Sequence, residues 1–99
     1  MLMDNTIQFT PSRAQMKERG NRYSAAASAR RHALAGVNAA YHALEIAHYV
    51  AEASQNDEAM VAELEAEDAV MAAVEALTEA QTQYVEAFHN YVLAPGDAA

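Results

Sequence analysis

Two acid–histidine pairs are the residues of this chain whose types and spacing could do chemistry. Glu45 and His48 are separated by two residues, and Glu86 and His89 repeat that spacing. On a helix, this spacing places the carboxylate and the imidazole on one face. Carboxylate oxygens and imidazole nitrogens are ligands for iron, manganese and zinc. The first pair could therefore supply two ligands of a metal site, if a further acid lies nearby.

The Glu-x-x-His element at residues 45–48 is similar to the ligand element of ferritin-like di-iron and di-manganese proteins, which add a glutamate from another helix. Short two-helix proteins of that kind dimerise into a metal-binding bundle. The resemblance implies a ligand set of Glu45, His48 and Glu67, completed by a second copy of the chain. The likeness covers these three residues, and nothing else in the chain matches such a family.

A structural role for the same histidine is the interpretation that we favour. The chain has 14 acids and four histidines among 99 residues, so a match to this short pattern arises readily by chance. His48 falls within an apolar stripe, where a hydrogen bond to Glu63 or Glu67 would satisfy a buried imidazole. Glu86 lies nearly opposite the stripe of its own helix, so we expect it in solvent. We therefore predict no cofactor and no catalytic residue, with the metal site as the alternative.

Two long helices are predicted to position these residues. From Tyr23 onward, and again from Met60 onward, large side chains recur in alternating steps of three and four, which indicates heptads. The polar residues Ser54-Gln55-Asn56-Asp57 offer capping side chains and predict a turn. We expect an all-α antiparallel hairpin with helices at about 22–54 and 58–93. The predicted contact residues are Tyr23, Ala27, Arg30, Leu34, Val37, Tyr41, Leu44, His48 and Ala51, then Met60, Leu64, Glu67, Met71, Val74, Leu77, Gln81, Tyr84, Phe88 and Tyr91.

A turn near Asn56 also predicts which residues face each other across the hairpin. The sequence numbers of two facing residues then add to about 112, because both helices rise by about 1.5 Å per residue. The expected pairs are Glu45 with Glu67, His48 with Leu64 and Glu63, Arg30 with Gln81, and Tyr23 with Phe88. Arg30 and Gln81 would form a polar layer that fixes the register.

The ends of the chain are predicted to differ from the hairpin. Residues 1–21 are interpreted as a basic arm with a short helix over about Pro11–Arg19, capped by Thr10. Gly20-Asn21 is expected to interrupt it, because both residues tolerate left-handed backbone. Residues 95–99, which begin with Pro-Gly, are expected to form a flexible tail.

Charge is distributed unevenly along the chain, whose net charge is −8. Residues 1–31 hold all six basic residues and two acids, which gives +4, whereas residues 32–99 hold twelve acids and no Lys or Arg, which gives −12. The acidic part would repel phosphates, so direct nucleic-acid binding is not expected. It favours a partner with a basic surface. The acids expected to contact that partner are Glu63, Glu65, Asp68, Glu75 and Glu79.

Composition narrows the class of protein. The chain has no cysteine, which excludes disulfides and thiolate metal sites, and it has no apolar run long enough for a membrane span. The first residues lack the pattern of a signal peptide, so we expect a cytoplasmic protein. Further apolar residues flank the predicted contact stripes and predict a homodimer that forms a four-helix bundle. These flanking residues are Ile46, Val50, Val61, Val70, Val85 and Val92.

These features together predict a small acidic protein-binding module without enzymatic activity. It would act as an inhibitor or accessory factor on a larger protein by masking a basic surface. In character it resembles small accessory proteins of phages and mobile elements. Two alternatives stay open. One is a ferritin-like metal-binding bundle, and the other is a structural assembly subunit whose basic arm docks on the acidic hairpin of a neighbour.

Overall fold

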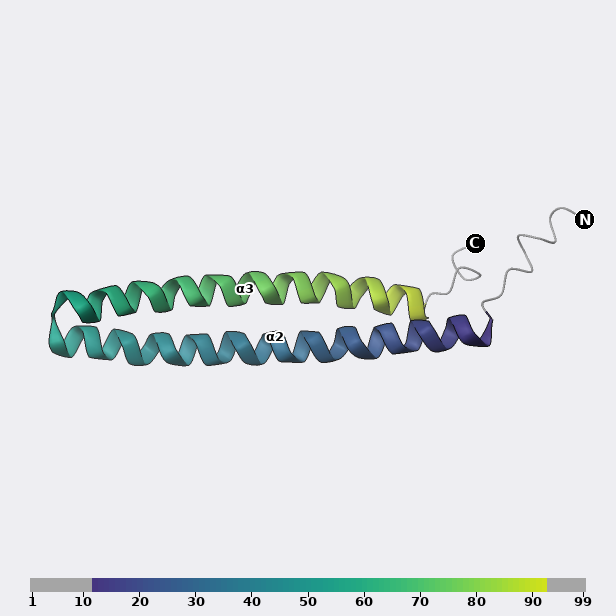
Figure 1. The fold of residues 1–99 in the computed structure, drawn as a ribbon, viewed down its shortest axis with the longest axis horizontal. Coiled ribbons are helices and arrows are strands. Elements are labelled where there is room, and N and C mark those ends of the chain that lie inside the picture. Colours follow the sequence, from purple (N-terminus) through teal and green to yellow (C-terminus); the bar gives the residue numbers. More distant parts are fainter. Residues whose placement is uncertain (1–11, 93–99) are drawn as a thin grey trace, which may run out of the picture.

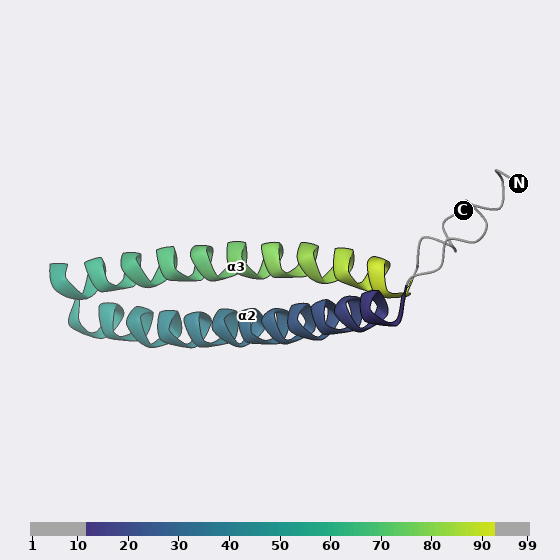
Figure 2. The same ribbon diagram turned by 45° about the vertical axis from the view of Figure 1, so that its right-hand side comes forward.

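The computed structural model describes residues 12–92 of the chain. They form two long helices, α2 (Arg13–Ser54) and α3 (Asp57–Val92), which run antiparallel side by side (Figures 1 and 2). At about 1.5 Å per residue the helices are about 63 and 54 Å long. Residues 12–92 contain no strand. The predicted all-α helical hairpin is therefore confirmed.

The turn consists of two residues that end one helix and begin the next. Gln55 adopts the left-handed conformation, with φ 52° and ψ 37°, and its N–H donates to the Ala51 carbonyl at 2.9 Å. The Asn56 side-chain oxygen accepts a hydrogen bond from the Ala59 N–H at 2.8 Å and caps α3. The polar residues thus form the turn where the sequence predicts it.

The predicted break in the first helix is wrong. Ser12 caps α2 through a reciprocal pair of hydrogen bonds with Gln15. The Gln15 N–H donates to the Ser12 hydroxyl at 3.1 Å, and the Ser12 N–H donates to Gln15 Oε1 at 2.7 Å. The helix then continues through Gly20 and Asn21. A β-carbon at Gly20 would lie 3.3 Å from the ring of Tyr91. This glycine therefore makes room for an aromatic side chain of the other helix and does not end its own.

Some predictions fall at the margins of the described residues. The short helix expected over Pro11–Arg19 is the beginning of α2, with Ser12 as its cap. Thr10, the rest of the arm and the tail at 95–99 lie outside the described residues. The second helix ends at Val92, one residue before its predicted end.

Alanine at every seventh position forms much of the contact between the helices. The repeat is buried or half-buried throughout, and it consists of Ala26, Ala33, Ala40 and Ala47 on α2 and Ala59, Ala66, Ala73, Ala80 and Ala87 on α3. A second buried or half-buried row lies beside it, namely Tyr23, Arg30, Val37, Leu44 and Ala51 with Glu63, Val70, Leu77 and Tyr84. We call these two rows the seam. Because alanine is small, the two backbones can approach closely along it.

The predicted contact stripe is correct for only one of these rows. The other large residues assigned to it, such as Leu34 and Tyr41 on α2 and Met60, Met71 and Val74 on α3, are exposed. They lie beside the seam on the same side of the hairpin. The alanine row lies between the helices because it lets them approach closely, and close approach brings many atoms into van der Waals contact. Bulky side chains in this row would keep the helices apart.

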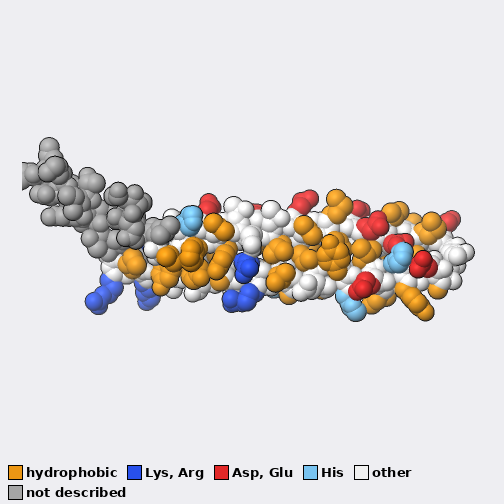
Figure 3. All heavy atoms as spheres, turned by 180° about the vertical axis from the view of Figure 1, so that it is seen from behind, with side chains coloured by type: hydrophobic (Ala, Val, Ile, Leu, Met, Phe, Trp, Pro, Cys, Tyr) orange, Lys and Arg blue, Asp and Glu red, His pale blue; other side chains and the backbone are white. Residues whose placement is uncertain are grey.

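The hairpin encloses few side chains. Among the described residues only four are buried, namely Val37, Ala51, Ala59 and Val70, whereas fourteen large apolar side chains are exposed. Eight of these fourteen lie to one side of the seam, either in the row beside it or in the next row outward on α3, and we call them the apolar face: Leu34, Tyr41, Met60, Leu64, Met71, Val74, Val85 and Phe88. Figure 3 shows a side of the rod along which hydrophobic side chains form a nearly continuous band.

Neither α2 nor α3 contains a stretch that is both long enough and apolar enough to cross a membrane.

Candidate functional site

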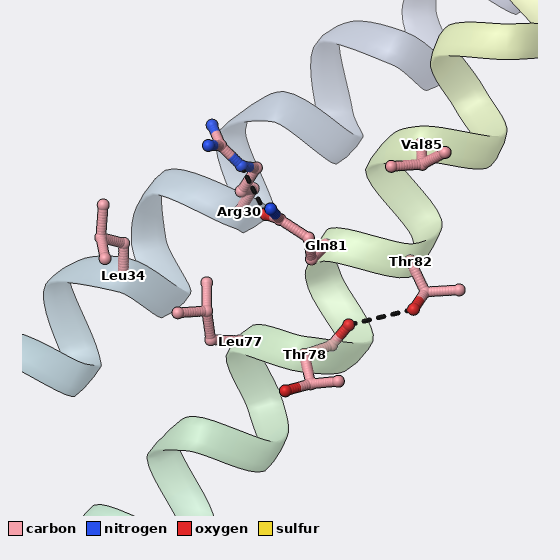
Figure 4. A pocket seen from close by; sticks show the side chains of 7 residues that line it. All are labelled: Arg30, Leu34, Leu77, Thr78, Gln81, Thr82 and Val85. Carbon is pink, nitrogen blue, oxygen red and sulfur yellow. Dashed lines mark hydrogen bonds between the residues drawn. The ribbon is translucent and has the colours of Figure 1, made fainter.

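A shallow groove of about 490 Å³ lies between the helices in the half of the rod farther from the turn (Figure 4). We call it the arginine groove, and it is lined by Arg30, Leu34, Leu77, Thr78, Gln81, Thr82 and Val85. The Nε of Arg30 donates to Gln81 Oε1 at 2.7 Å, and its guanidinium carbon lies 5.1 Å from the centre of the Tyr84 ring. The predicted Arg30–Gln81 pair is therefore confirmed.

Arg30 carries a charge that the hairpin does not neutralise. Among the described residues no carboxylate lies within ion-pair distance of its guanidinium. The hydrogen bond to Gln81 occupies Nε and leaves the two terminal nitrogens to other partners (Figure 4). The groove thus combines apolar walls with one positioned cation.

A second groove, of about 340 Å³, lies nearer the turn. We call it the histidine groove, and it is lined by Tyr41, Leu44, Glu45, His48, Glu63 and Glu67. The Nδ1 of His48 donates a hydrogen bond to the Glu63 carboxylate, and its Nε2 lies 3.4 Å from a carboxylate oxygen of Glu52. This contact confirms the predicted hydrogen bond between His48 and Glu63. The predicted burial of the imidazole is wrong, because the His48 side chain is 57% exposed beside the seam.

The acids around His48 favour its charged form. The hydrogen bond to Glu63 raises the pKa of His48 above its usual value, and the negative charges of Glu52, Glu63 and Glu67 raise it further. Partial removal from water acts in the opposite direction and is outweighed. Even with a protonated histidine, this groove holds more negative than positive groups.

The residues of the metal alternative come together only in part. Glu45, His48 and Glu67 line the same groove. Within residues 12–92, however, no group of three or more His, Asp or Glu side chains is arranged to hold a metal ion. Glu45 instead has a carboxylate oxygen 3.9 Å from Nδ1 of His42. A metal site here would need ligands from a second copy.

Aromatic side chains close the end of the hairpin opposite the turn. The Tyr23 ring centre lies 5.5 Å from that of Tyr84, 6.0 Å from Phe88 and 5.4 Å from Tyr91. The hydroxyls of Tyr23 and Tyr84 are 3.2 Å apart, and this hydrogen bond is the main cause that raises the pKa of Tyr23 above its usual value. The predicted Tyr23–Phe88 contact is confirmed, and the cluster fixes the register of the open end.

No family model matches this sequence, and comparisons with curated proteins and with solved structures gave no match. Function must therefore be inferred from the side chains that the hairpin presents.

The predicted partner-binding acids occupy two different places. Glu63 is half-buried in the seam, where its side chain is 23% exposed and bonded to His48, so its assignment to a partner-binding surface is not supported by its position. Glu65, Asp68, Glu75 and Glu79 are exposed. At about 100° per residue, these four point away from the seam positions of α3 and therefore away from α2.

Two further acids extend this outer surface. Glu58 and Glu86 are exposed and fall on the same side of α3 by helical spacing. We call the six residues the acidic ridge: Glu58, Glu65, Asp68, Glu75, Glu79 and Glu86. Sequence reasoning missed these two members, although their spacing of seven from Glu65 and Glu79 was the signal that could have found them. It also missed most of the apolar face, because the sequence pattern assigns seven of the eight residues to the contact between the helices and only Val85 to the flanking positions.

Proposed function

We propose that the protein is a non-enzymatic binding module that attaches through its acidic ridge to a basic surface of a larger protein, as an inhibitor or accessory factor. The observation that carries the proposal is a line of six exposed carboxylates on a helix that has no lysine or arginine. Binding would mask the basic surface and keep other acidic ligands from it.

The shape of the ridge suits an elongated partner surface. Glu58 and Glu86 are 28 residues apart, so the ridge spans about 42 Å along α3. The charges are held on a single long helix, and little has to become ordered when they bind. Like charges aligned over this length would speed association with a basic partner and make the affinity sensitive to salt.

The basic residues of the chain do not oppose the ridge. Arg13, Lys17, Arg19 and Arg22 all lie in the first three turns of α2, and Arg22 pairs with Glu18 at 3.4 Å. Arg30 lies in its groove beside Gln81, and Arg31 is exposed on α2. No ion pair among residues 12–92 joins a basic residue to an acid of the ridge. The ridge is therefore available to a partner over its length. The proposal places the module in the cytoplasm, a compartment that suits a chain without cysteine.

A paired comparison of variants tests the proposal. Affinity capture from a cell lysate, followed by mass spectrometry, would compare the unmodified protein with a Glu65→Lys, Asp68→Lys variant. The control is Glu18→Lys, Glu52→Lys, which changes the net charge equally but alters exposed acids of α2. We expect the ridge variant alone to lose the basic protein that the unmodified chain captures, while circular dichroism shows equal helicity. Capture of the same proteins by the ridge variant would reject the proposal.

A ferritin-like metal-binding bundle is a second candidate, supported by Glu45, His48 and Glu67 sharing one groove. It requires two copies to align so that their histidine grooves meet. Elemental analysis of protein purified without chelators would then show iron, manganese or zinc near one or two ions per dimer. Metal contents far below that ratio would remove this candidate.

An assembly subunit is a third candidate, supported by the separation of charge between the beginning of α2 and the acidic α3. Its basic end would contact the acidic ridge of the next copy, so assemblies would shorten as salt increases. Sedimentation profiles that are identical at low and high salt would exclude it.

A further inference from the structure

We propose that two copies of this chain pack antiparallel through their apolar faces, about a two-fold axis at Val74, with Arg30 of each copy opposite Glu67 of the other. This inference concerns a different surface from the acidic ridge, and it stands or falls independently of the proposed function.

The large side chains of the apolar face are exposed, because they lie outside the seam that joins α2 and α3. Leu64 is 60% exposed and Met71 is 64% exposed, and the face extends along much of the rod. Single exposed apolar residues are ordinary on a protein surface, but contiguous bands mark places where another surface packs. The face includes Tyr41 and Phe88, and aromatic side chains are enriched at protein interfaces.

The face is arranged symmetrically about Val74. One row of α3 consists of Met60, Glu67, Val74, Gln81 and Phe88, each seven residues from the next. A two-fold axis through Val74 therefore brings Met60 of one copy opposite Phe88 of the other, and Glu67 opposite Gln81. In the adjoining row, the same operation brings Leu64 to within one residue, about 1.5 Å, of the level of Val85, and Met71 equally close to that of Thr78. A self-complementary surface of this kind is what a two-fold dimer needs.

The two grooves carry complementary charges at equal distances from the axis. Arg30 is held at the level of Gln81 by its hydrogen bond and lines the arginine groove. Glu67 lines the histidine groove. Gln81 and Glu67 each lie seven residues from Val74, which is about 10 Å along the axis of α3. The two-fold axis thus sets the cation of one copy against the carboxylates of the other, twice in each dimer.

A parallel dimer through the same face would be disfavoured. Each residue would then lie opposite the same residue of the second copy, so Arg30 would face Arg30 and Glu67 would face Glu67. Like charges opposed across an interface weaken association. The antiparallel arrangement converts both repulsions into attractions, and it separates the two histidine grooves, so it also competes with the metal candidate above.

Charge reversal tests the pairing. The dimer dissociation constant is measured by sedimentation equilibrium for Arg30→Glu, for Glu67→Arg and for the double variant. We expect each single change to weaken the dimer about tenfold or more, because two contacts become repulsive, and the double variant to regain most of the loss. Within one chain Arg30 and Glu67 are about 21 Å apart in level, so the rescue cannot arise inside a hairpin. Arg22→Glu and Glu65→Arg are the controls away from this face.

Cysteine cross-linking tests the direction independently of any effect of Arg30→Glu on the hairpin. The chain has no cysteine, so introduced ones report unambiguously. A mixture of Met60→Cys and Phe88→Cys chains should form a disulfide-linked dimer, and neither variant should do so alone. Cross-linking of Phe88→Cys with itself, a double variant as weak as the single ones, or a monomer at every concentration would each overturn the proposal.

Discussion

The electrostatic environment of His48 is set by acids from both helices of the hairpin. Three acids act on it, Glu52 from the next turn of α2 and Glu63 and Glu67 from α3. Only Glu63 is held in the seam, and it accepts the hydrogen bond from Nδ1. The imidazole thereby joins the two helices near the turn, on the side of the apolar face.

Stability should fall as pH rises through the folded pKa of His48. Because this pKa is raised on folding, the stabilisation is fully present below the unfolded value of about 6.5 and is lost above the folded value. Urea unfolding at several pH values between about 5.5 and 9 measures this. We expect the midpoint to decrease across this range and the decrease to shrink in His48→Gln. His42→Gln serves as the control, and an unchanged pH dependence in the His48 variant would contradict the prediction.

At the scale of the helices, the sequence predicts the hairpin well but the rotation of each helix poorly. The turn at Gln55–Asn56 follows from local cap chemistry, which neighbouring residues decide. The rotation depends on whether the alanine rows or the larger apolar rows face the other helix. Both rows repeat every seven residues, so periodicity alone cannot separate them, and only packing of the two surfaces decides.

The same reasoning explains which site residues the sequence could predict. Arg30–Gln81 and His48–Glu63 follow from register, because the position of the turn fixes which levels meet. The exposure of Glu67, in contrast, follows from the rotation. Gly20 was misinterpreted because a glycine signal is local, whereas its cause is the ring of Tyr91 on the other helix.

Enlarging an alanine of the seam should destabilise the hairpin. Ala73→Leu adds bulk where the helices approach closely, and overpacking of this kind costs about 1–3 kcal/mol. The neighbouring Ala72 is exposed, so Ala72→Leu provides a matched control with little effect. Thermal unfolding followed by circular dichroism compares the two. Equal melting temperatures for the two variants would show that Ala73 does not lie in a close contact.

Replacing Gly36 by alanine should stabilise α2. A β-carbon at Gly36 would meet no atom within 4 Å, and the gain in helix propensity is about 0.5–1 kcal/mol. Gly20→Ala should gain less, because its β-carbon would lie 3.3 Å from Tyr91 and the ring must shift. Chemical denaturation ranks the two variants, and a larger gain at Gly20 would contradict this account of its role.

At the scale of the whole molecule, the described residues separate three kinds of surface around one rod. The seam joins the helices, the apolar face lies to one side of it, and the acidic ridge faces outward from α3. Few side chains are buried within a single hairpin. Much of the stability should therefore come from covering the apolar face.

The melting temperature should accordingly rise with protein concentration. A dimer unfolds with a midpoint that depends on concentration, because association favours the folded state by mass action. Scans over about a hundredfold range of concentration would show the rise, and Glu67→Arg should reduce the midpoint at each concentration. A midpoint that is constant over that range would indicate that the single hairpin is stable without a partner.

The single tight turn at Gln55 and Asn56 has a consequence for motion. Contacts between the helices have ever larger sequence separations with distance from the turn, from His48 with Glu63 to Tyr23 against Tyr91. Closing the longer loops costs more chain entropy, so the helices should separate first at the aromatic end and last at the turn. Amide hydrogen exchange would then be fastest in the first turns of α2 and slow progressively toward Ala51, and the chain would behave as a zipper with one fixed end.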